Sequence, residues 1–338
     1  MNNKKRVTSY DVAREAGVSQ SAVSRVFRPG LSVSKKTREK VLATAKRMGY
    51  KPNAIARMLI TQSSGMVAVI VSSRANLNYP EVLSLLNKQI AERNKRVLLF
   101  TLDDAEGLSD LLEQLWTFQV DGVIALAAHF DHNSIQEFEQ HQIPVVLYNR
   151  QVDDHSVSSV CVNHEHGLKQ LVDLLVSHDH QDFLIIAGPA DSDVANDRKM
   201  YALKALEAHG ITEVPVVEGD YSYESGREAL NAYLAKNNAP TAIIAGNDTM
   251  AIGVVDEARE NHGLSVPDQL SVVGFDGINA ATWYSYQVTT IKQPISQMTK
   301  AAVDILLDQI ENPDNPAETR FWSGSLVEGT SVAAARKK

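Results

Sequence analysis

The chain has 338 residues, too many for one hydrophobic core, so we expect two or three domains. Its 44% hydrophobic and 22% charged residues are typical of globular proteins, and no apolar run approaches the length of a membrane span. The net charge of −8 is unevenly distributed: residues 1–60 carry 14 basic and 3 acidic side chains, a net +11, which leaves −19 for the remainder. This segregation indicates that only the first segment approaches a polyanion.

The N-terminal residues and the cysteine content predict the compartment. Met1-Asn-Asn-Lys-Lys-Arg6 lacks the apolar core of a signal peptide, so we expect a cytoplasmic protein with a basic, disordered arm at residues 1–6. The single cysteine, Cys161, permits no internal disulfide, which agrees with a reducing compartment. It lies in an apolar segment, so a buried and inert thiol is expected.

Two short helices joined by a tight turn are predicted next. The apolar residues of Tyr10–Ala16 fall on one helical face, and Val23 and Val26 fall on one face of the following segment. Gly17 can take the positive φ that such a turn needs, and Ser19 suits an N-cap. This pattern is a helix-turn-helix, which offers its second helix to the DNA major groove. On this stretch alone, an ordinary surface hairpin of helices remains the alternative.

The polar side of that second helix carries groups suited to reading bases. Gln can make two hydrogen bonds to adenine and Arg two to guanine. The side chains concerned are Gln20, Ser21, Ser24 and Arg25. A third helix is predicted from Lys35 to Met48, with Ser34 as its N-cap and Gly49 just past its end.

A short linker separates this basic segment from the rest. Residues 51–64 contain one helical pattern, Asn53–Leu59. Seven residues are too few to hold a helix in water, because nucleation costs more than so few hydrogen bonds return. We therefore expect this helix to form only with the support of DNA and a partner chain.

From Met66 onward, apolar runs rich in β-branched residues alternate with amphipathic helical patterns. The predicted strands are Met66–Val71, Val97–Phe100, Gly122–Leu126, Val145–Leu147, Val160–Val162, Phe183–Ala187, Val214–Val217, Ala242–Ala245 and Ser271–Phe275. The predicted helices include Glu81–Arg93, Glu165–Val176, Arg198–Ala208, Glu224–Ala235, Met250–Glu260 and Ile295–Ile310. The alternation predicts parallel sheets covered on both faces. Nine strands exceed one comfortable sheet, so we expect an α/β body of two Rossmann-like lobes.

Sequence motifs for catalysis and metal binding are missing. The chain has no Gly-x-Ser-x-Gly elbow, Gly-x-Gly-x-x-Gly loop or P-loop, so we do not expect an enzyme. Histidines occur in pairs, but no cysteine or third ligand joins them at zinc spacing, so we expect solvated loop histidines, no metal and no cofactor. The pairs are His129 with His132, His164 with His166, and His178 with His180.

Two parts of the chain resemble one family. The run Val7-Thr-Ser-Tyr-Asp-Val-Ala … Val-Ser-Lys-Lys-Thr-Arg-Glu-Lys-Val … Gly-Tyr-Lys-Pro-Asn resembles the DNA-binding headpiece of the lac/galactose repressor (LacI/GalR) family, from Val7 to about Leu59. Segments such as Gly246-Asn-Asp-Thr-Met-Ala-Ile-Gly and Leu264-Ser-Val-Pro-Asp-Gln-Leu-Ser-Val-Val-Gly-Phe-Asp276 resemble its effector domain. The resemblance extends to about Val332. It implies an all-α helix-turn-helix head plus two lobes like a type I periplasmic binding protein, with a ligand between the lobes.

The resemblance also implies the domain organisation. The head covers residues 1–50, and a hinge linker covers 51–64 with its helix at 53–59. The effector-binding and dimerisation domain covers 65–332, with an N-lobe of about 65–163 plus 294–322 and a C-lobe of about 164–293 plus 323–332. The tail, 333–338, has no leucine heptads, so no tetramerisation coil is expected.

Roles in DNA binding are implied by position. Gln20, Ser21 and Arg25 stand where the family reads base edges. Thr8, Tyr10, Ser19, Ser24, Ser34 and Thr37 stand where it touches phosphates or positions the head, although Tyr10 and Ser24 could instead serve packing and capping within the head. Asn53, Ala56 and Leu59 stand on the minor-groove hinge helix, with Leu59 as the wedge between base pairs. Arg28-Pro29-Gly30 departs from the family's usual Asn and small polar loop, but Arg28 could reach a phosphate.

Roles in effector binding follow in the same way. Tyr79, Arg198, Tyr221, Asn247 and Asp276 stand at positions that resemble the family's ligand contacts. Tyrosine faces can stack on a sugar, while Arg and Asp hold neighbouring hydroxyls. Trp283 is a weaker candidate, for which we favour packing.

Two further positions depart from the family pattern. Asn163 stands where Asp is usual, and Asp179-His180 stands where Gly-His is usual. We expect both departures to be structural.

The implied function is a sequence-specific repressor released from its operator by a small sugar or sugar derivative. A homodimer on a pseudo-palindromic operator in double-stranded DNA is expected, with no membrane partner. A co-repressor-dependent regulator or an activator of the same family is the alternative. A periplasmic-type sugar-binding protein, or an enzyme with a basic head, is a third; the +11 segment and the lack of a signal peptide argue against it.

Overall fold

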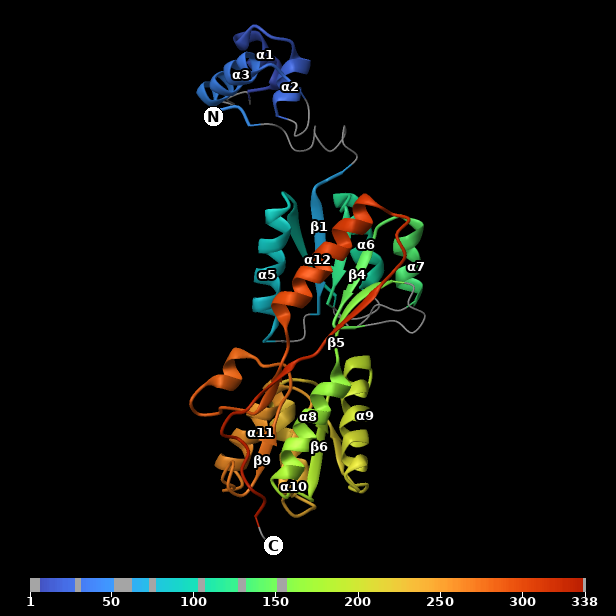
Figure 1. The fold of residues 1–338 in the computed structure, drawn as a ribbon, viewed down its shortest axis with the longest axis vertical. Helices are drawn as coiled ribbons and strands as arrows, with labels where there is room; N and C mark the ends of the chain where they lie inside the picture. The colour runs from blue at the N-terminus through green and yellow to red at the C-terminus, as the bar shows by residue number, and fades with distance from the viewer. Residues whose placement is uncertain are drawn as a thin grey trace. The chain divides into compact units, whose positions relative to one another are not determined.

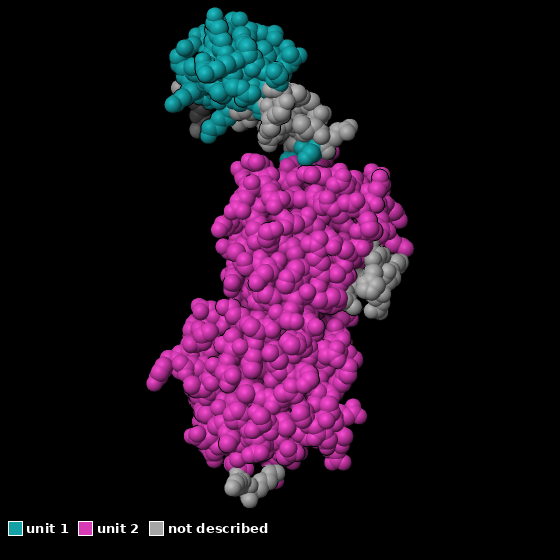
Figure 2. Space-filling view, viewed as in Figure 1, with its two compact units in different colours: residues 1–64 teal, residues 65–338 magenta. Residues whose placement is uncertain are grey.

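The computed structural model describes residues 7–27, 32–51, 63–72, 77–102, 107–126, 132–150 and 157–336. The chain divides into two compact units, Met1–Ser64 and Gly65–Lys338, which Figure 2 shows in different colours. In the described ranges, no helix is long and apolar enough to cross a membrane. The expectations for residues 1–6, for Arg28-Pro29-Gly30, for the hinge helix 53–59 and for the last two residues lie outside the described residues.

The first unit contains the predicted helix-turn-helix and third helix. Helices α1 (Ser9–Ala16), α2 (Gln20–Val26) and α3 (Lys35–Met48) pack around a small core. That core consists of Val12, Ala13, Ala16, Val23, Val26, Val41 and Ala45. Gly17 has φ 58° and Gly49 has φ 66°, so both glycines take the left-handed conformation that ends a helix.

The second unit contains two lobes, each built on a sheet whose described neighbouring strands are all parallel. The first lobe has the strand order β11-β5-β4-β3-β1-β2. Its strands are β1 (Met66–Val71), β2 (Arg96–Thr101), β3 (Gly122–Ala125), β4 (Val145–Tyr148), β5 (Ser158–Val162) and β11 (Thr319–Trp322). Its helices are α5 (Tyr79–Glu92), α6 (Leu108–Phe118), α7 (His132–Gln140) and α12 (Ile295–Glu311).

Alternate residues of one strand explain how helices cover both faces of this sheet. Val67 and Val69 of β1 belong to a cluster with α5 and α12, whereas Ala68 and Ile70 belong to a cluster with α6 and α7. Successive side chains of a strand point to opposite faces, so a continuous apolar run requires cover on both sides. Figure 1 shows α5 and α12 beside β1.

The second lobe repeats this plan with the strand order β7-β6-β8-β9. Its strands are β6 (Phe183–Ala187), β7 (Val216–Glu218), β8 (Ala242–Ala245) and β9 (Ser271–Val273). Its helices are α8 (His164–Ser177), α9 (Asp193–Ala208), α10 (Tyr223–Leu234), α11 (Asp248–Glu260) and the 3-10 helix η1 (Asn279–Thr282). Helices α8 and α9 cover one face, and α10 and α11 the other. The predicted fold class, a helical head with two parallel-sheet lobes, is confirmed.

The chain crosses between the lobes after β5, before α12 and after β11 (Figure 1). Next to these crossings, β10 (Thr290–Lys292) and β12 (Ser325–Val327) form an antiparallel ribbon. The predicted strand Ser271–Phe275 ends earlier, at Val273. Beyond that point Gly274 and Asp276 donate backbone hydrogen bonds to Thr289 and Ile291, which places Asp276 against a crossover segment.

Cys161 is buried, as predicted, and burial raises the pKa of its thiol to about 11. Asn163 caps α8, since its Oδ1 accepts from the backbone of His166 at 2.9 Å, and Asp179 has φ 64°, a conformation that favours the glycine it replaces. Both departures are therefore structural.

Other expectations were wrong. His164 and His180 are buried rather than solvated: His164 lies against Phe275, and the ring of His180 is hydrogen-bonded to the carbonyl of Ala333. Burial lowers the pKa of both imidazoles. Trp283 is 57% exposed just after η1, so the expected packing role is not observed.

Candidate functional site

The helix starts in the first unit use hydroxyl side chains predicted to contact DNA. The caps are Thr8 for α1, Ser19 for α2 and Ser34 for α3, which accept from the backbone of Asp11 (3.3 Å), Ala22 (3.2 Å) and Thr37 (3.2 Å). The hydroxyls of Ser34 and Thr37 also lie 2.8 Å apart. A helix N-terminus favours anions, because its backbone N–H groups and dipole point outward. These residues therefore fix helix starts that suit phosphate.

The base-reading candidates lie along α2. Ser21 and Arg25 are exposed, while Gln20 and Ser24 are half-buried. The Gln20 amide donates to the hydroxyl of Ser9 at 3.3 Å, which is a weak hydrogen bond that a base edge could replace. No ion pair to Arg25 is found among the described residues. Tyr10 is 71% exposed, so the alternative of packing within the head is not supported.

A pocket of about 160 Å³ lies between the two lobes of the second unit. All five predicted effector residues line it: Tyr79, Arg198, Tyr221, Asn247 and Asp276. Several lining residues follow the carboxyl ends of strands, as expected for open parallel sheets. Asn247 follows β8 and Asp276 follows β9 in the second lobe, while Asn149 follows β4 in the first.

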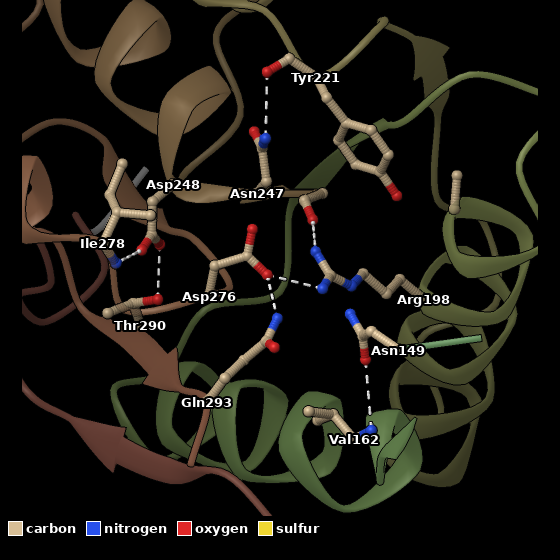
Figure 3. A network of polar contacts seen from close by, with 12 residues as sticks. Asn149, Val162, Arg198, Tyr221, Asn247, Asp248, Asp276, Ile278, Thr290 and Gln293 are labelled. Atoms are coloured by element: carbon tan, nitrogen blue, oxygen red, sulfur yellow. Dashed lines mark hydrogen bonds and ion pairs between the residues drawn. The ribbon is translucent and has the colours of Figure 1, made fainter. Parts of the chain in front are cut away.

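A buried ion pair forms the centre of the pocket wall (Figure 3). Nη2 of Arg198 donates to Oδ1 of Asp276 at 2.7 Å, and Nη1 donates to the carbonyl of Gly246 at 2.7 Å. The guanidinium lies 4.2 Å from the ring centroid of Phe275, a cation–π contact. Oδ1 of Asp276 also accepts from Nε2 of Gln293 at 2.6 Å. In the described part of the chain, Oδ2 of Asp276 has no such donor and can accept from a ligand hydroxyl.

Asn247 holds two parts of the pocket wall in place. Its Oδ1 accepts from the backbone of Met250 at 2.8 Å, which caps α11, and its Nδ2 donates to the carbonyl of Tyr221 at 3.0 Å. Tyr221, whose carbonyl accepts this hydrogen bond, has φ 72°. The ring of Tyr221 packs so closely on Gly188 that a Cβ there would lie 2.4 Å from Cζ. Burial raises the pKa of the Tyr221 hydroxyl to about 12, so the hydroxyl stays neutral.

A second buried carboxyl lies beside this pocket. Asp248 accepts from the hydroxyl of Thr290 and from the backbone of Ile278 at 2.9 Å. Burial, and then the nearby charge of Asp276, raise the pKa of Asp248 to about 8. Its hydrogen bonds join the start of α11 to β10, beside the crossover that carries Gln293.

Several pocket residues were missed from the sequence. Tyr148, Asn149 and Arg150 come directly after the predicted strand Val145–Leu147, so the carboxyl-end rule could have identified them. Gln293 lies in a segment noted only for its family resemblance, Thr289-Thr-Ile-Lys-Gln-Pro294. Within the described ranges, no group of His, Cys, Asp or Glu side chains is placed to hold a metal ion.

Comparison with known proteins covers nearly the whole chain. Residues 8–53 match the pattern described as bacterial regulatory proteins, lacI family, and residues 172–332 match a periplasmic binding protein-like domain. Catabolite control protein A of Priestia megaterium is 33% identical over 304 residues, 89% of this chain and 91% of that protein.

Two solved structures of transcriptional regulators are also similar to this chain. The lac repressor dimer bound to operator and the anti-inducer ONPF is 30% identical, covering 98% of this chain and 100% of that one, with a TM-score of 0.89. The complex of the transcriptional regulator CelR with cellobiose is 27% identical, covering 96% of this chain and 100% of that one, with a TM-score of 0.75.

Proposed function

The chain belongs to the lacI family of bacterial regulatory proteins, and from this we propose that it is a repressor released from its operator by a small sugar or sugar derivative. It is a DNA-binding transcriptional regulator and not an enzyme. In the proposal, the head of residues 1–50 binds DNA and the linker of residues 51–64 orders on it. The domain of residues 65–332 binds the effector and dimerises. The protein acts in the cytoplasm.

The polar wall of the pocket is the main support for a sugar as the effector. Among the described residues, Oδ2 of Asp276 is left to accept from a ligand hydroxyl, and the ion pair between Nη2 of Arg198 and Oδ1 of Asp276, at 2.7 Å, fixes the position of that carboxylate. Tyr79 and Tyr221 add aromatic faces on which C–H groups of a sugar can stack. The structurally similar CelR was solved in complex with cellobiose, which supports a sugar as the effector of this chain.

For DNA, the proposal assigns base reading to α2. Gln20, Ser21 and Arg25 are taken to reach base edges in the major groove, and the capped helix starts to touch phosphates. The similar lac repressor was solved as a dimer on its operator, which supports a dimer of this chain on a pseudo-palindromic site. The hinge residues Asn53, Ala56 and Leu59 are assigned to the minor groove by position alone.

Two binding experiments test the proposal in order. Full-length protein is first used to select fragments from genomic DNA, and a gel shift measures affinity for the best fragment against random DNA. The selected complex is then titrated with a panel of sugars. The proposal expects a fragment bound at least about a thousandfold more tightly than random DNA, and a sugar that releases it. A sugar that tightens the complex would instead support a co-repressor, and binding without sequence preference would contradict the proposal.

Ser34→Asp should separate phosphate contact from helix capping. Asp caps a helix as well as Ser does, so the melting temperature of the protein should hardly change. A carboxylate at the start of α3 would repel phosphate, so operator and random DNA should both bind about tenfold more weakly at low salt. Gel shifts at several salt concentrations measure this, with Thr44→Ser in the core of α3 as a control for general disturbance. Unchanged DNA affinity would place the start of α3 away from the backbone.

The assembly of the protein gives a second check. Symmetric operators are read by two-fold dimers, so multi-angle light scattering at micromolar concentration should report twice the mass of the 37.1 kDa chain. A monomer that remains monomeric on operator DNA would contradict the dimer. A stable tetramer would contradict the proposed dimer as well.

A further inference from the structure

The pocket wall contains hydrogen-bond donors that the described residues leave unused. The hydroxyl of Tyr148, Nε of Arg150 and Nε of Arg198 are buried and have no partner in the described part of the chain. The hydroxyl of Tyr221 is not counted with them, because the side chain of Ser192 is within hydrogen-bonding reach of it. Buried polar atoms in folded proteins are normally paired, so this gathering of unpaired atoms around one pocket indicates a ligand that would pair them.

The unused capacity is mostly donor capacity. The two guanidinium nitrogens can only donate, and the hydroxyl of Tyr148 can donate or accept. On the acceptor side, Oδ1 of Asp276 already accepts from Arg198 at 2.7 Å and from Gln293 at 2.6 Å, which leaves Oδ2 of the same carboxylate for a ligand hydroxyl. Each sugar hydroxyl brings a donor of its own, whereas a carboxylate only accepts. A carboxylate therefore matches these donors better than a further hydroxyl does.

Arg150 already forms a weak ion pair with one carboxylate. Its Nη2 lies 2.8 Å from Oδ2 of Asp193, whose side chain is 62% exposed while that of Arg150 is 19% exposed. Arg150 follows β4 in the first lobe, and Asp193 begins α9 in the second, so the pair bridges the pocket. A half-exposed ion pair is weak, and the dipole of α9 would stabilise Asp193 if its carboxylate turned into water.

We propose that the effector carries a carboxylate, as a sugar acid does, and that this carboxylate replaces Asp193 on Arg150. The inference rests on the proposed function, because it names the chemical class bound in the same pocket. Arg150 keeps one carboxylate partner before and after the exchange, so the ligand's charge is not buried unpaired. Nε and Nη2 can together hold both oxygens of the incoming group, which also pairs the nitrogen that Asp193 leaves unused. Asp276 keeps Arg198 and Gln293 and receives the sugar hydroxyls.

Matched ligand pairs test this by isothermal titration calorimetry on the full-length protein. The probes are D-glucuronate with D-glucose, D-galacturonate with D-galactose, and D-gluconate with D-sorbitol. We expect the acid of at least one pair to bind about tenfold or more tightly than its neutral counterpart. Arg150→Gln should lower the affinity for the acid to that for the neutral compound. Arg150→Lys should retain part of the difference in affinity between the two compounds.

Asp193→Asn is the more decisive variant, because it removes the carboxylate that competes with the ligand for Arg150. Its affinity for the acid should rise severalfold, while its affinity for the neutral sugar should stay the same or fall. Asp173→Asn, an exposed carboxylate of α8 outside the pocket, is the matched control. Melting temperatures check that each variant folds; if Arg150→Gln does not, the Asp193 variant decides alone. Neutral sugars that bind as tightly as their acids, or an Asp193→Asn variant that weakens the acid, would overturn the inference. If no compound in either series binds, the sugar effector of the proposed function fails, and this inference fails with it.

Discussion

Replacing Asp276 with asparagine is expected to raise the effector concentration that half-releases the operator by roughly 10- to 100-fold. Asparagine keeps the size of the side chain, and its oxygen can still accept from Arg198 and Gln293 in place of Oδ1. Its amide nitrogen cannot accept the ligand hydroxyl that Oδ2 would take, and the buried guanidinium of Arg198 loses its counter-charge. Operator affinity without effector should change by less than about threefold, because the base-reading residues belong to the other compact unit.

The experiment titrates operator-bound protein with the sugar that releases the wild type. Asp173→Asn is the control, because it removes a carboxylate from the same lobe at an exposed site beside Lys169. A thermal melt should show that the Asp276 variant folds. If the release midpoint of Asp276→Asn equals that of the control, Asp276 is not a ligand contact.

Arg25→Ala is expected to weaken operator binding by at least about 30-fold. A two-point contact from arginine to guanine contributes about 1–3 kcal/mol, and a dimer makes the contact in both half-sites. Binding to random DNA should fall much less, because the change removes one of many positive charges. The side chain is exposed on α2, so its removal should leave the core of the first unit intact.

Gel shifts on operator and on random DNA of equal length measure both losses. Arg47→Ala is the matched control: it removes an exposed arginine from α3 that is paired with Glu15 at 2.8 Å. Equal losses on the two DNAs for Arg25→Ala would assign Arg25 to a phosphate instead of a base.

The fold was largely predictable because most buried strands and helices have a recognisable pattern of apolar residues. The run Met66–Val71 is apolar throughout, and the structure buries it between two layers of helices. Strand β11 was missed for the converse reason: Thr319–Trp322 forms an edge strand, and its middle residues, Arg320 and Phe321, are exposed. A strand paired on one side carries little apolar signal.

The site was only partly predictable, because the pocket depends on long-range geometry. The resemblance placed Arg198 and Asp276, but not their hydrogen bonds to Gly246 and Gln293, since these join residues far apart in the sequence. The same reason hid the pairing of Arg150 with Asp193 across the lobes. Thr8 and Ser34, to which DNA contacts were assigned, cap α1 and α3, a role that the sequence could already suggest.

In the proposed mechanism, the hinge of residues 53–59 couples effector binding to operator binding. Leu59 lies outside the described residues, and its assigned role is to wedge open a base step while the hinge helices of the two chains pack together. A helix of seven residues forms only with that support, so an effector that changes the arrangement of the lobes can shift the hinge between order and disorder. The effector can do so only through a difference in affinity for the two arrangements.

Reciprocal titrations measure the coupling between effector binding and operator binding. Operator affinity is measured with and without saturating effector, and effector affinity with and without operator. Linkage requires that both affinities fall by the same factor. We expect that factor to lie between about 5 and 150, as is usual for allosteric coupling. A rise in both affinities would identify a co-repressor, and an operator affinity that the bound effector leaves unchanged would rule out the proposed coupling.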